Sequence, residues 1–229
     1  MTGRGRILLV DDHPLIALGL QLALTARGWE VETSSGPTAA AVVAHACIFG
    51  PECVVLDVHL GVDVGSGVDL IGPLRQVGTS VVMLTGETNR CTLASCLEAG
   101  ALGWIGKGNG LEEVVASIGD AVAGRALIGC ATRAALLDEL RTHRASLGRA
   151  MSPFQRLTSC EQRVLGALIE GMSAEEIAEA HFVALTTIRS QIRAILHKLG
   201  VRSQLAAVAQ ANRVGWQPPT PVRQLVGAR

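Results

Sequence analysis

The sequence contains no tyrosine, and aromatic residues make up only 3% of its 229 positions. Charged residues are also sparse, at 17%, which is below the content typical of disordered chains. The apolar share of 48% supplies enough aliphatic side chains for a sizeable core. The length fits one large domain or two small ones, so we expect a folded protein of one or two domains.

Long apolar runs and metal-type cysteine spacings are also missing. Only four strongly apolar residues separate Arg6 from Asp11, too few for the core of a signal peptide. The longest uncharged run, residues 33–51, contains serine, glycine, proline and histidine, so it is too polar to span a bilayer. The six cysteines form no CxxC pair and sit within apolar patterns. We therefore expect a reduced, cytoplasmic protein with no membrane contact and no catalytic cysteine.

Charge is divided unevenly between the two halves of the chain. The formal net charge is zero, yet residues 1–124 carry 6 Lys/Arg against 13 Asp/Glu, while residues 125–229 carry 14 against 7. The halves therefore have net charges of −7 and +7. An acidic half joined to a basic half indicates two functions, and the basic half is a candidate for binding a polyanion.

Short apolar runs alternate with helix-length segments through residues 1–124. The expected strands are Ile7–Val10, Glu30–Thr33, Cys53–Leu56, Val81–Leu84 and Gly103–Ile105. The expected helices are Pro14–Arg27, Pro37–Ala46, Val68–Gln76, Asn89–Ala99 and Leu111–Gly124. Because helical crossovers connect parallel strands, this pattern predicts an α/β fold, a doubly wound five-stranded parallel sheet of the flavodoxin-like kind.

The rest of the chain has no strand pattern. Residues 125–152 are predicted to be a linker with one helix, Ala131–Leu147, which Gly148 and the Ser152-Pro153 pair should end. Residues 153–215 read as an all-α domain of four short helices. The proline-containing tail, residues 216–229, is predicted to be disordered.

Polar residues follow four of the predicted strands. Asp11 and Asp12 follow the first strand, Asp57 the third, Thr85 the fourth and Lys107 the fifth. In a parallel sheet these ends meet at one edge, where functional groups gather. Two carboxylates about 4 Å apart repel by about 4 kcal/mol at an effective dielectric of about 20, so a hard cation such as Mg²⁺ is expected between them. Such a site can hold a phosphoryl group on the remaining carboxylate.

A simpler reading exists for each of these residues alone. An aspartate at the end of a strand is commonly a helix N-cap, and Asp12 stands two residues before Pro14. A lysine in that position is usually solvated. The nucleophile of haloacid-dehalogenase-type phosphatases carries a second aspartate two residues on, whereas His59 occupies that place after Asp57. That substitution argues against this class of phosphatase.

The motifs ILLV before Asp11-Asp12, VVLD ending at Asp57, VVMLT ending at Thr85 and GALGWIGK at 100–107 resemble the receiver domain of response regulators. The resemblance covers about residues 6–124. It implies that Asp57 accepts phosphate from a sensor histidine kinase. It also implies that Mg²⁺ is bound by Asp57, by Asp12 directly, by Asp11 through water, and by the backbone carbonyl of His59.

The same resemblance assigns the switch residues. Thr85 and Lys107 would contact the phosphoryl group, and Thr85 would pull its loop inward so that Trp104 can rotate. Trp104 stands where Tyr or Phe is usual. The loop after Asp57 lacks the usual proline, is about two residues longer, and contains three glycines that should make it flexible.

The basic half begins with two capping signals. Thr158 precedes Glu161, and Ser173 precedes Glu176, at the spacing of the capping box that opens a helix. A third helix, Thr187–Leu199, is predicted to bury a stripe of isoleucines and to present basic and small polar groups on its opposite face. This arrangement has the logic of a helix-turn-helix. The plain alternative is a helical bundle with a solvated basic face.

Residues 157–208 resemble the LuxR-type DNA-binding domain. The resemblance places seven residues at DNA-contacting positions: Thr187, Arg189, Ser190, Arg193, Lys198, Arg202 and Ser203. It also makes the last helix, Gln204–Arg213, the dimerisation helix. Ala184 replaces the usual serine cap of the recognition helix, which costs about 1 kcal/mol unless Thr186 compensates.

Together the two halves resemble the NarL/FixJ class of two-domain response regulators. This resemblance implies a non-enzymatic, phosphorylation-switched transcription regulator that binds double-stranded DNA and forms a homodimer on activation. Two other readings stay open at this point. One is a DNA-binding regulator whose degenerate receiver works without phosphate, and the other is a phosphoryl-transfer enzyme.

Overall fold

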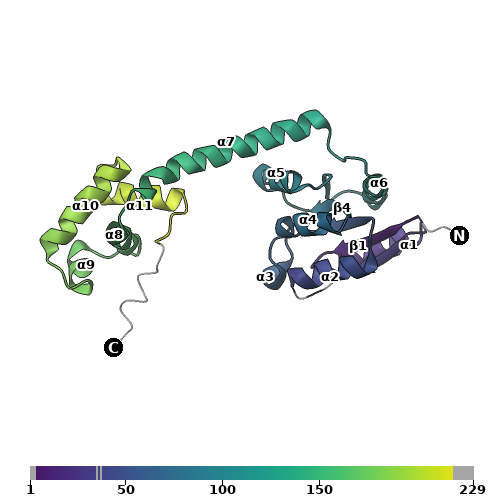
Figure 1. The fold of residues 1–229 in the computed structure, drawn as a ribbon, viewed down its shortest axis with the longest axis horizontal. Coiled ribbons are helices and arrows are strands. Elements are labelled where there is room, and N and C mark those ends of the chain that lie inside the picture. Colours follow the sequence, from purple (N-terminus) through teal and green to yellow (C-terminus); the bar gives the residue numbers. More distant parts are fainter. Residues whose placement is uncertain (1–3, 35, 37, 219–229) are drawn as a thin grey trace. The chain divides into compact units, whose positions relative to one another are not determined.

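The chain divides into two compact units, Met1–Arg141 and Thr142–Arg229. The computed structural model describes residues 4–34, 36 and 38–218 (Figure 1). Within the described residues, none of the helices combines the length and apolarity needed to cross a membrane.

The first unit is built on a parallel sheet with the strand order β2-β1-β3-β4-β5. Its strands are β1 (Arg6–Val10), β2 (Glu30–Thr33), β3 (Cys53–Leu56), β4 (Ser80–Thr85) and β5 (Trp104–Gly106). The order places β1 and β3 side by side, and β3 beside β4, so their carboxyl ends form one edge. The predicted five-stranded α/β fold is confirmed.

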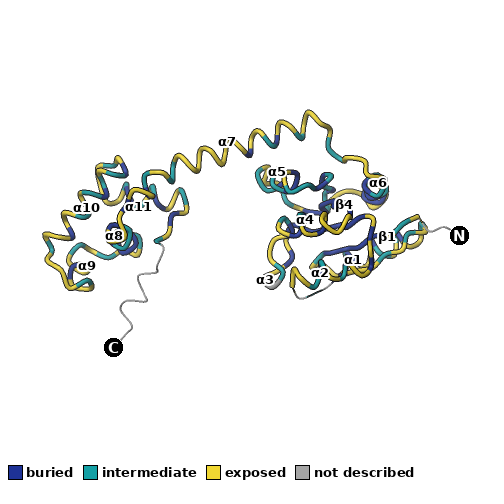
Figure 2. The backbone as a smooth tube through the Cα atoms, viewed as in Figure 1, coloured by how far each residue is buried: buried dark blue, intermediate teal, exposed yellow. Residues whose placement is uncertain are grey.

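Helices cover both faces of this sheet. They are α1 (Pro14–Thr25), α2 (Ala39–Phe49), α3 (Gly61–Val64), α4 (Gly67–Gln76), α5 (Arg90–Ala99) and α6 (Leu111–Val122). Residues of α2, α4 and α5 form one core with the sheet, and residues of α1 and α6 form the other. β3 is buried along its whole length, and Figure 2 shows the buried strands between the more exposed helices. This burial explains the unbroken apolar runs in the sequence.

The loop after β3 contains the one short helix, α3, that the sequence pattern did not predict. Gly61 and Gly65 flank it with φ angles of 78° and 85°, which favour glycine. A β-bridge between His59 and Ser66 closes the loop. Gly61 and Gly65 thus occupy backbone positions that suit glycine, and the predicted flexibility of this loop stays a prediction.

Helix α7 spans Cys130–Gln155 and therefore runs through the positions where the sequence predicted its end. Gly148 costs a helix only about 1 kcal/mol, which packing at both ends can offset. Pro153 falls in the last turn, where the loss of one hydrogen bond is tolerated. Leu136 and Leu140 are buried in the first unit and Phe154 in the second. Between them, residues 141–149 are all exposed.

The second unit contains α8 (Ser159–Ile169), α9 (Ala174–Ala180), α10 (Leu185–Leu199) and α11 (Gln204–Arg213). Both predicted capping boxes are present, at Thr158 with Glu161 and at Ser173 with Glu176. The predicted buried stripe of α10 is also confirmed, since Ile188, Ile192, Ile195 and Leu199 lie in the core. Helix α10 begins two residues earlier than predicted.

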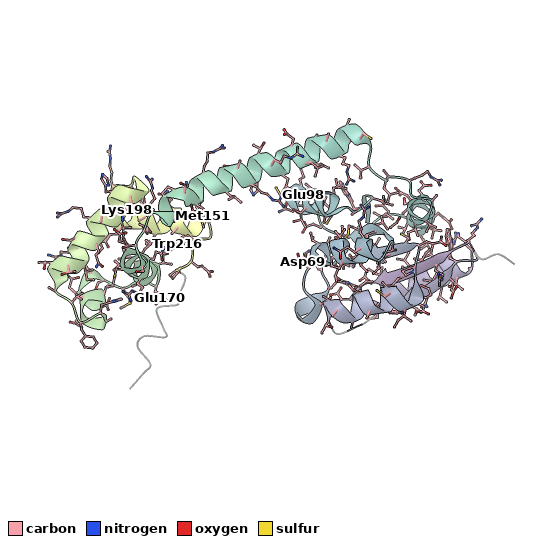
Figure 3. All side chains as sticks on the ribbon, in the orientation of Figure 1. Asp69, Glu98, Met151, Glu170, Lys198 and Trp216 are labelled. Carbon is pink, nitrogen blue, oxygen red and sulfur yellow. The ribbon has the colours of Figure 1, made fainter. Side chains whose placement is uncertain are left out.

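Trp216 corrects the prediction that the chain is disordered from residue 216 onward. Its ring stacks on Phe154 with a centroid distance of 5.6 Å, and only 8% of the residue is exposed. Figure 3 labels Trp216 among the helices of the second unit. The large apolar surface of the indole makes burial favourable despite the prolines that follow. The remaining tail positions, 219–229, lie outside the described residues.

Candidate functional site

The carboxyl edge of the sheet brings three aspartates into one cluster. Asp11 and Asp12 follow β1, and Asp57 follows β3. The N–H of Asp57 donates to the carbonyl of Val10 at 2.9 Å. Ligand atoms of Asp11, Asp12, His13 and Asp57 all lie within 4.8 Å of one another. The side chains of Asp11 and Asp57 are only 5% and 4% exposed. The carboxylates of Asp11 and Asp57 are therefore held largely out of water.

Lys107, which follows β5, points its ammonium into this cluster. Its Nζ lies 2.7 Å from Asp57 Oδ2 and 2.8 Å from Asp11 Oδ2. Partial burial alone would lower the pKa of Lys107, but hydrogen bonds to Asp11 and Asp57 outweigh it and raise that pKa. Lys107 is therefore a fixed positive charge against the Asp57 carboxylate.

The donor set of the cluster fits a hard divalent cation. Asp11 Oδ2 is buried, and within the described residues it accepts no well-directed hydrogen bond. Its contact with the Lys107 ammonium is therefore an ion pair. Carboxylate oxygens are the ligands that Mg²⁺ prefers. Asp12, whose side chain is 39% exposed, leaves one side of the cluster open to solvent. The residues that could hold the ion are Asp11, Asp12 and Asp57.

His13 is a member of this cluster that is not among the site residues predicted from the sequence. Its Nδ1 lies 2.7 Å from Asp12 Oδ1 and 3.1 Å from Asp11 Oδ1. His13, not Asp12, is the N-cap residue of α1, and it makes no side-chain capping bond. The N-cap explanation for Asp12 therefore fails. The signal available in the sequence was the direct adjacency of His13 to the two aspartates.

Thr85 ends β4 and is 2% exposed. Its Oγ1 accepts a hydrogen bond from the N–H of Glu87 at 3.0 Å, and its carbonyl accepts from the N–H of Lys107 at 3.0 Å. The main chain of the lysine at the cluster is thus tied directly to the threonine. Trp104 is half-buried and packs against the core beneath α4 and against a second cluster formed by α5 and α7.

The imidazole of His59 does not enter the acidic cluster. It is 72% exposed, and its Nε2 lies 3.5 Å from Glu87 Oε2. Hydrogen bonds from the backbone of Asn89 and Thr88, together with His59, keep the pKa of Glu87 below its usual value. The His59–Glu87 pair therefore joins the loops after β3 and β4 at the rim of the site.

Helix α7 contacts the same region of the first unit through its N-terminal half. Arg133 donates to the carbonyls of Leu97 and Ala101 at 2.6 and 3.0 Å, at the end of α5 and just before β5. Leu136 and Leu140 form a buried cluster with residues of α5, and Trp104 packs against it. Trp104 of β5 therefore packs against the cluster that α7 forms with α5.

In the second unit, α10 presents the predicted polar face. Thr187, Arg189, Ser190 and Arg193 are exposed, and Ser190, Arg193, Ala194, His197 and Lys198 line a hollow of 360 Å³. Ala184 is the N-cap residue of α10 and provides no side-chain cap. Arg189 Nη2 lies 3.1 Å from Glu175 Oε1, so an acidic residue of α9 orients this arginine.

Two of the predicted interface residues have structural partners. Lys198 Nζ lies 2.6 Å from Oε2 of Glu161, a carboxylate that is 8% exposed and also closes the capping box of α8. Burial alone would raise the pKa of Glu161, but Lys198 and Thr158 lower it. The Ser203 hydroxyl caps α11 by accepting from the N–H of Ala206 at 3.1 Å. Arg202 is exposed.

Two of the cysteines, Cys53 and Cys96, are buried in the first unit. Burial raises the pKa of Cys53 to about 12 and that of Cys96 to about 11, so both remain protonated thiols. All six cysteines are free.

Comparison with known families matches both halves of the chain. The response regulator receiver domain matches residues 7–119, and the bacterial regulatory proteins of the luxR family match residues 155–211. The chain is 30% identical to the DNA-binding transcriptional activator DevR/DosR of Mycobacterium tuberculosis, over 91% of this chain and 94% of that protein. It is 29% identical to the nitrate/nitrite response regulator NarP of Escherichia coli, over 88% and 92%.

A likeness to a solved structure extends over most of the fold. The response regulator RcsB of Salmonella typhimurium matches with a TM-score of 0.50 and 21% identity, covering 93% of this chain and 100% of that one. The similar proteins named here are regulators rather than enzymes. The chain belongs to the two-domain response regulators of the NarL/FixJ class, transcription factors in which a receiver domain is joined to a LuxR-type helix-turn-helix domain.

Proposed function

We propose that the receiver domain accepts a phosphoryl group on Asp57 from a sensor histidine kinase, and that this event controls binding of double-stranded DNA by α10. The main support is the contact of 2.7 Å between Lys107 Nζ and Asp57 Oδ2 in a nearly buried carboxylate cluster. A carboxylate in such a place is desolvated and oriented. It is also paired with a cation that can transfer its contact to the negative oxygens of an incoming phosphoryl group.

In the transfer step, an Asp57 oxygen forms a bond to phosphorus while the bond from phosphorus to the leaving group breaks. The electron pair departs with the donor, which is an imidazole nitrogen in phosphohistidine or a carboxylate oxygen in acetyl phosphate. Asp12, Asp57 and the carbonyl of His59, with Asp11 acting through water, would hold Mg²⁺, which would supply positive charge to the phosphoryl oxygens. Lys107 then shifts its contact from Asp57 to a phosphoryl oxygen, and the Thr85 hydroxyl donates to another.

The signal leaves the site through Thr85 and Trp104. A phosphoryl group adds negative charge beside Lys107, whose N–H is bonded to the Thr85 carbonyl. Movement of the β4 and β5 ends changes the packing of Trp104 against the α5–α7 cluster. Because α7 continues without a break from Cys130 to Gln155, a shift in its first half reaches the core that contains Phe154. Helix α7 is therefore the proposed coupling element.

DNA binding is assigned to the exposed face of α10 that carries Thr187, Arg189, Ser190 and Arg193, with Arg202 beside it. Arginine recognises guanine edges or phosphates, and serine allows close approach of the backbone. The ammonium of Lys198 neutralises Glu161 first, so Lys198 contributes less than Arg193 to the contact with DNA. Phosphorylation also favours a homodimer through α11, on which Leu205 is 79% exposed.

Acetyl phosphate with Mg²⁺ tests the phosphorylation site. The full chain should gain one phosphoryl group by intact-mass spectrometry, whereas Asp57→Asn should gain none. Lys107→Ala should still be labelled. It should fail to dimerise or to gain DNA affinity, because the contact between the lysine and the phosphoryl group is lost. Equal labelling of wild type and Asp57→Asn would refute the site.

Genomic fragments selected by the phosphorylated chain supply the DNA for the second test. Arg193→Ala should weaken binding and reduce the slope of log affinity against log salt by about 0.9 for one lost phosphate contact. Arg149→Ala, an exposed residue of α7, is the matched control and should bind normally. If wild type binds equally with and without phosphoryl donor, the receiver works independently of phosphate.

A further inference from the structure

A hollow of 220 Å³ adjoins the acidic cluster of the receiver, and we call it the Ser34 hollow. Its polar lining consists of Asp11, Asp12 and Ser34, and its apolar lining includes Val10, Val42 and Leu60. The described residues that line it include neither Asp57 nor Lys107. A molecule in the Ser34 hollow therefore contacts the cluster without occupying the proposed phosphoryl acceptor.

Ser34 brings an unpartnered hydroxyl to this hollow. The residue directly follows β2 and is 6% exposed, and its N–H donates to the carbonyl of Leu9 at 2.8 Å, which fixes its main chain. Its Oγ is buried and has no hydrogen-bond partner among the described residues. A buried hydroxyl without a partner destabilises a fold, and alanine would occupy the same position without that cost. The hydroxyl of Ser34 therefore indicates a polar ligand in the hollow.

A second acceptor in the same lining is incompletely satisfied. Asp11 Oδ2 is buried and accepts no well-directed hydrogen bond in the described part of the chain, although Lys107 Nζ lies 2.8 Å from it. The Asp12 side chain is 39% exposed, so the third polar group of the lining is open to solvent. Carboxylates accept hydrogen bonds, and a hydroxyl can also accept one. A ligand that satisfies all three groups must therefore bring hydrogen-bond donors.

Charge and shape narrow the ligand to a small organic cation. The carboxylates of Asp11, Asp12 and Asp57 together with the ammonium of Lys107 give the cluster a formal charge of −2, so an anion is repelled. The aliphatic walls cannot replace the water around a metal ion, whereas they suit a hydrocarbon group. A primary ammonium has three N–H donors, which equals the number of polar groups in the lining. The volume is below the roughly 300 Å³ at which pockets for larger ligands begin, so the hydrocarbon part must be short.

We propose that the Ser34 hollow binds a short-chain primary ammonium compound. Its ammonium donates to Asp11, Asp12 and Ser34, and its aliphatic part packs against Val42 and Leu60. The bound compound opposes Mg²⁺, because both ligands place positive charge at Asp12. This antagonism rests on the proposed function, whereas the binding itself does not. Because the coupling between two ligands is reciprocal, each must weaken the other by the same factor.

Isobutylammonium is the probe for the binding. The full chain, labelled with ¹⁵N, is titrated at pH 7 without Mg²⁺, and the amide signals of Val10, Ser34 and Val42 should shift with a saturable dependence. Isobutanol lacks the charge, isobutyrate reverses it, and isobutyltrimethylammonium keeps it without N–H donors, so each should bind at least tenfold more weakly. The absence of shifts with isobutylammonium would overturn the proposal and leave water as the partner of Ser34. Equal binding of the trimethyl compound would overturn the role of the three acceptors.

Ser34→Ala tests the hydroxyl directly. This variant should bind isobutylammonium at least fivefold more weakly than wild type, while its midpoint of thermal unfolding should not fall, because the lost hydroxyl had no partner. Ser95→Ala, which removes a hydroxyl that donates to the Cys91 carbonyl at 2.9 Å, is the matched control and should bind the probe as wild type does. Val64→Phe places a ring in the hollow from α3 and should abolish the binding. Wild-type affinity of Ser34→Ala for the probe would overturn the proposal.

A competition experiment tests the antagonism. Saturating Mg²⁺ should weaken isobutylammonium binding severalfold, and isobutylammonium should weaken Mg²⁺ binding in isothermal titration calorimetry by the same factor. Ser34→Ala without the probe should bind Mg²⁺ and be labelled by acetyl phosphate as wild type is. Independent binding of the two ligands would refute the antagonism. Failure of Asp57 to be labelled in wild type would refute the proposed function and the antagonism with it, and the titration without Mg²⁺ would still decide whether the Ser34 hollow binds an ammonium compound.

Discussion

A β-carbon on Gly67 would lie 1.9 Å from the carbonyl oxygen of Asp57. The N–H of Gly67 also donates to the carbonyl of Val58 at 2.8 Å. The start of α4 is therefore packed directly on the main chain that carries the proposed phosphoryl acceptor. Glycine is required here by the close approach of two backbones, since the φ of Gly67 is not positive.

Gly67→Ala should displace Asp57 and destabilise the receiver, because neither the Asp57 backbone nor α4 has room to move independently. We expect a marked fall in the midpoint of thermal unfolding and the loss of labelling by acetyl phosphate. Gly72→Ala, in the same helix with no atom within 4 Å of its new β-carbon, is the control. It should be stabilising by up to about 1 kcal/mol and label normally. Normal labelling of Gly67→Ala would show that the close approach does not position Asp57.

The sequence allowed the acidic cluster to be predicted because strand ends in a parallel sheet share one edge. Asp11, Asp57 and Lys107 could be placed together by topology alone. The close approach of Gly67 to the Asp57 backbone could not be predicted from the sequence. It depends on the path of the loop between them, which has no periodic pattern. His13 was missed for a similar reason, since the side-chain direction at a helix start does not follow from spacing.

Ala184 leaves the N-terminus of α10 without a side-chain cap. Ala184→Ser places an acceptor at a residue that already has the extended backbone of an N-cap, so it should stabilise the second unit by about 1 kcal/mol. Ser203→Ala removes the cap that α11 possesses and should destabilise by a similar amount. Urea unfolding followed by circular dichroism measures both changes. No stabilisation by Ala184→Ser would indicate that Thr186 or a neighbour already satisfies these N–H groups.

Glu161 should make the stability of the second unit depend on acidity. Its pKa lies below the ordinary value because Lys198 and Thr158 favour the charged form despite burial. Its stabilising contribution is therefore complete above pH 4.5 and is lost as the pH falls through the lowered pKa. Glu161→Gln should lower the free energy of unfolding at pH 7 by about 2 kcal/mol and remove this pH dependence.

Glu176→Gln is the comparison for that experiment, because Glu176 also closes a capping box but is exposed and pairs with no cation in the described residues. Its effect should be smaller, because its carboxylate is exposed to solvent. Unfolding measured by urea titration at several pH values separates the two variants. Equal losses in both would show that the contact with Lys198 adds nothing to the cap.

Boundaries at the two ends of the second unit were the least predictable part of the fold. Gly148 and Pro153 are local signals for a helix end, and Pro218 and Pro219 are local signals for disorder. Tertiary packing outweighs the helix-end signals of Gly148 and Pro153, since Phe154 is buried at the end of α7. The stacking of Phe154 with Trp216 likewise extends the core past the predicted domain end. Contacts between residues so distant in sequence leave no trace in local patterns.

Trp216→Ala should destabilise the second unit by about 3 kcal/mol or more, because it removes a buried ring and leaves a cavity beside Phe154. Trp216→Phe keeps an aromatic partner and should cost less. Truncation after Gly215 should behave like the alanine variant. Differential scanning calorimetry can assign the change to one of the two units. A truncated chain as stable as the full one would show that the stacking of Trp216 on Phe154 does not stabilise the second unit.

Leu140 provides a test of the coupling between the receiver and α7. The residue is 3% exposed, in the cluster that α7 forms with α5, and Trp104 packs against this cluster. Leu140→Ala should weaken that contact while leaving the acidic cluster intact, so labelling of Asp57 should be unchanged. DNA binding should then become less dependent on phosphorylation, because α7 no longer follows Trp104. Leu147→Ala, on the exposed stretch of the same helix, should leave both measurements as in wild type. If Leu140→Ala preserves the full effect of phosphorylation on DNA affinity, the signal does not pass through this contact.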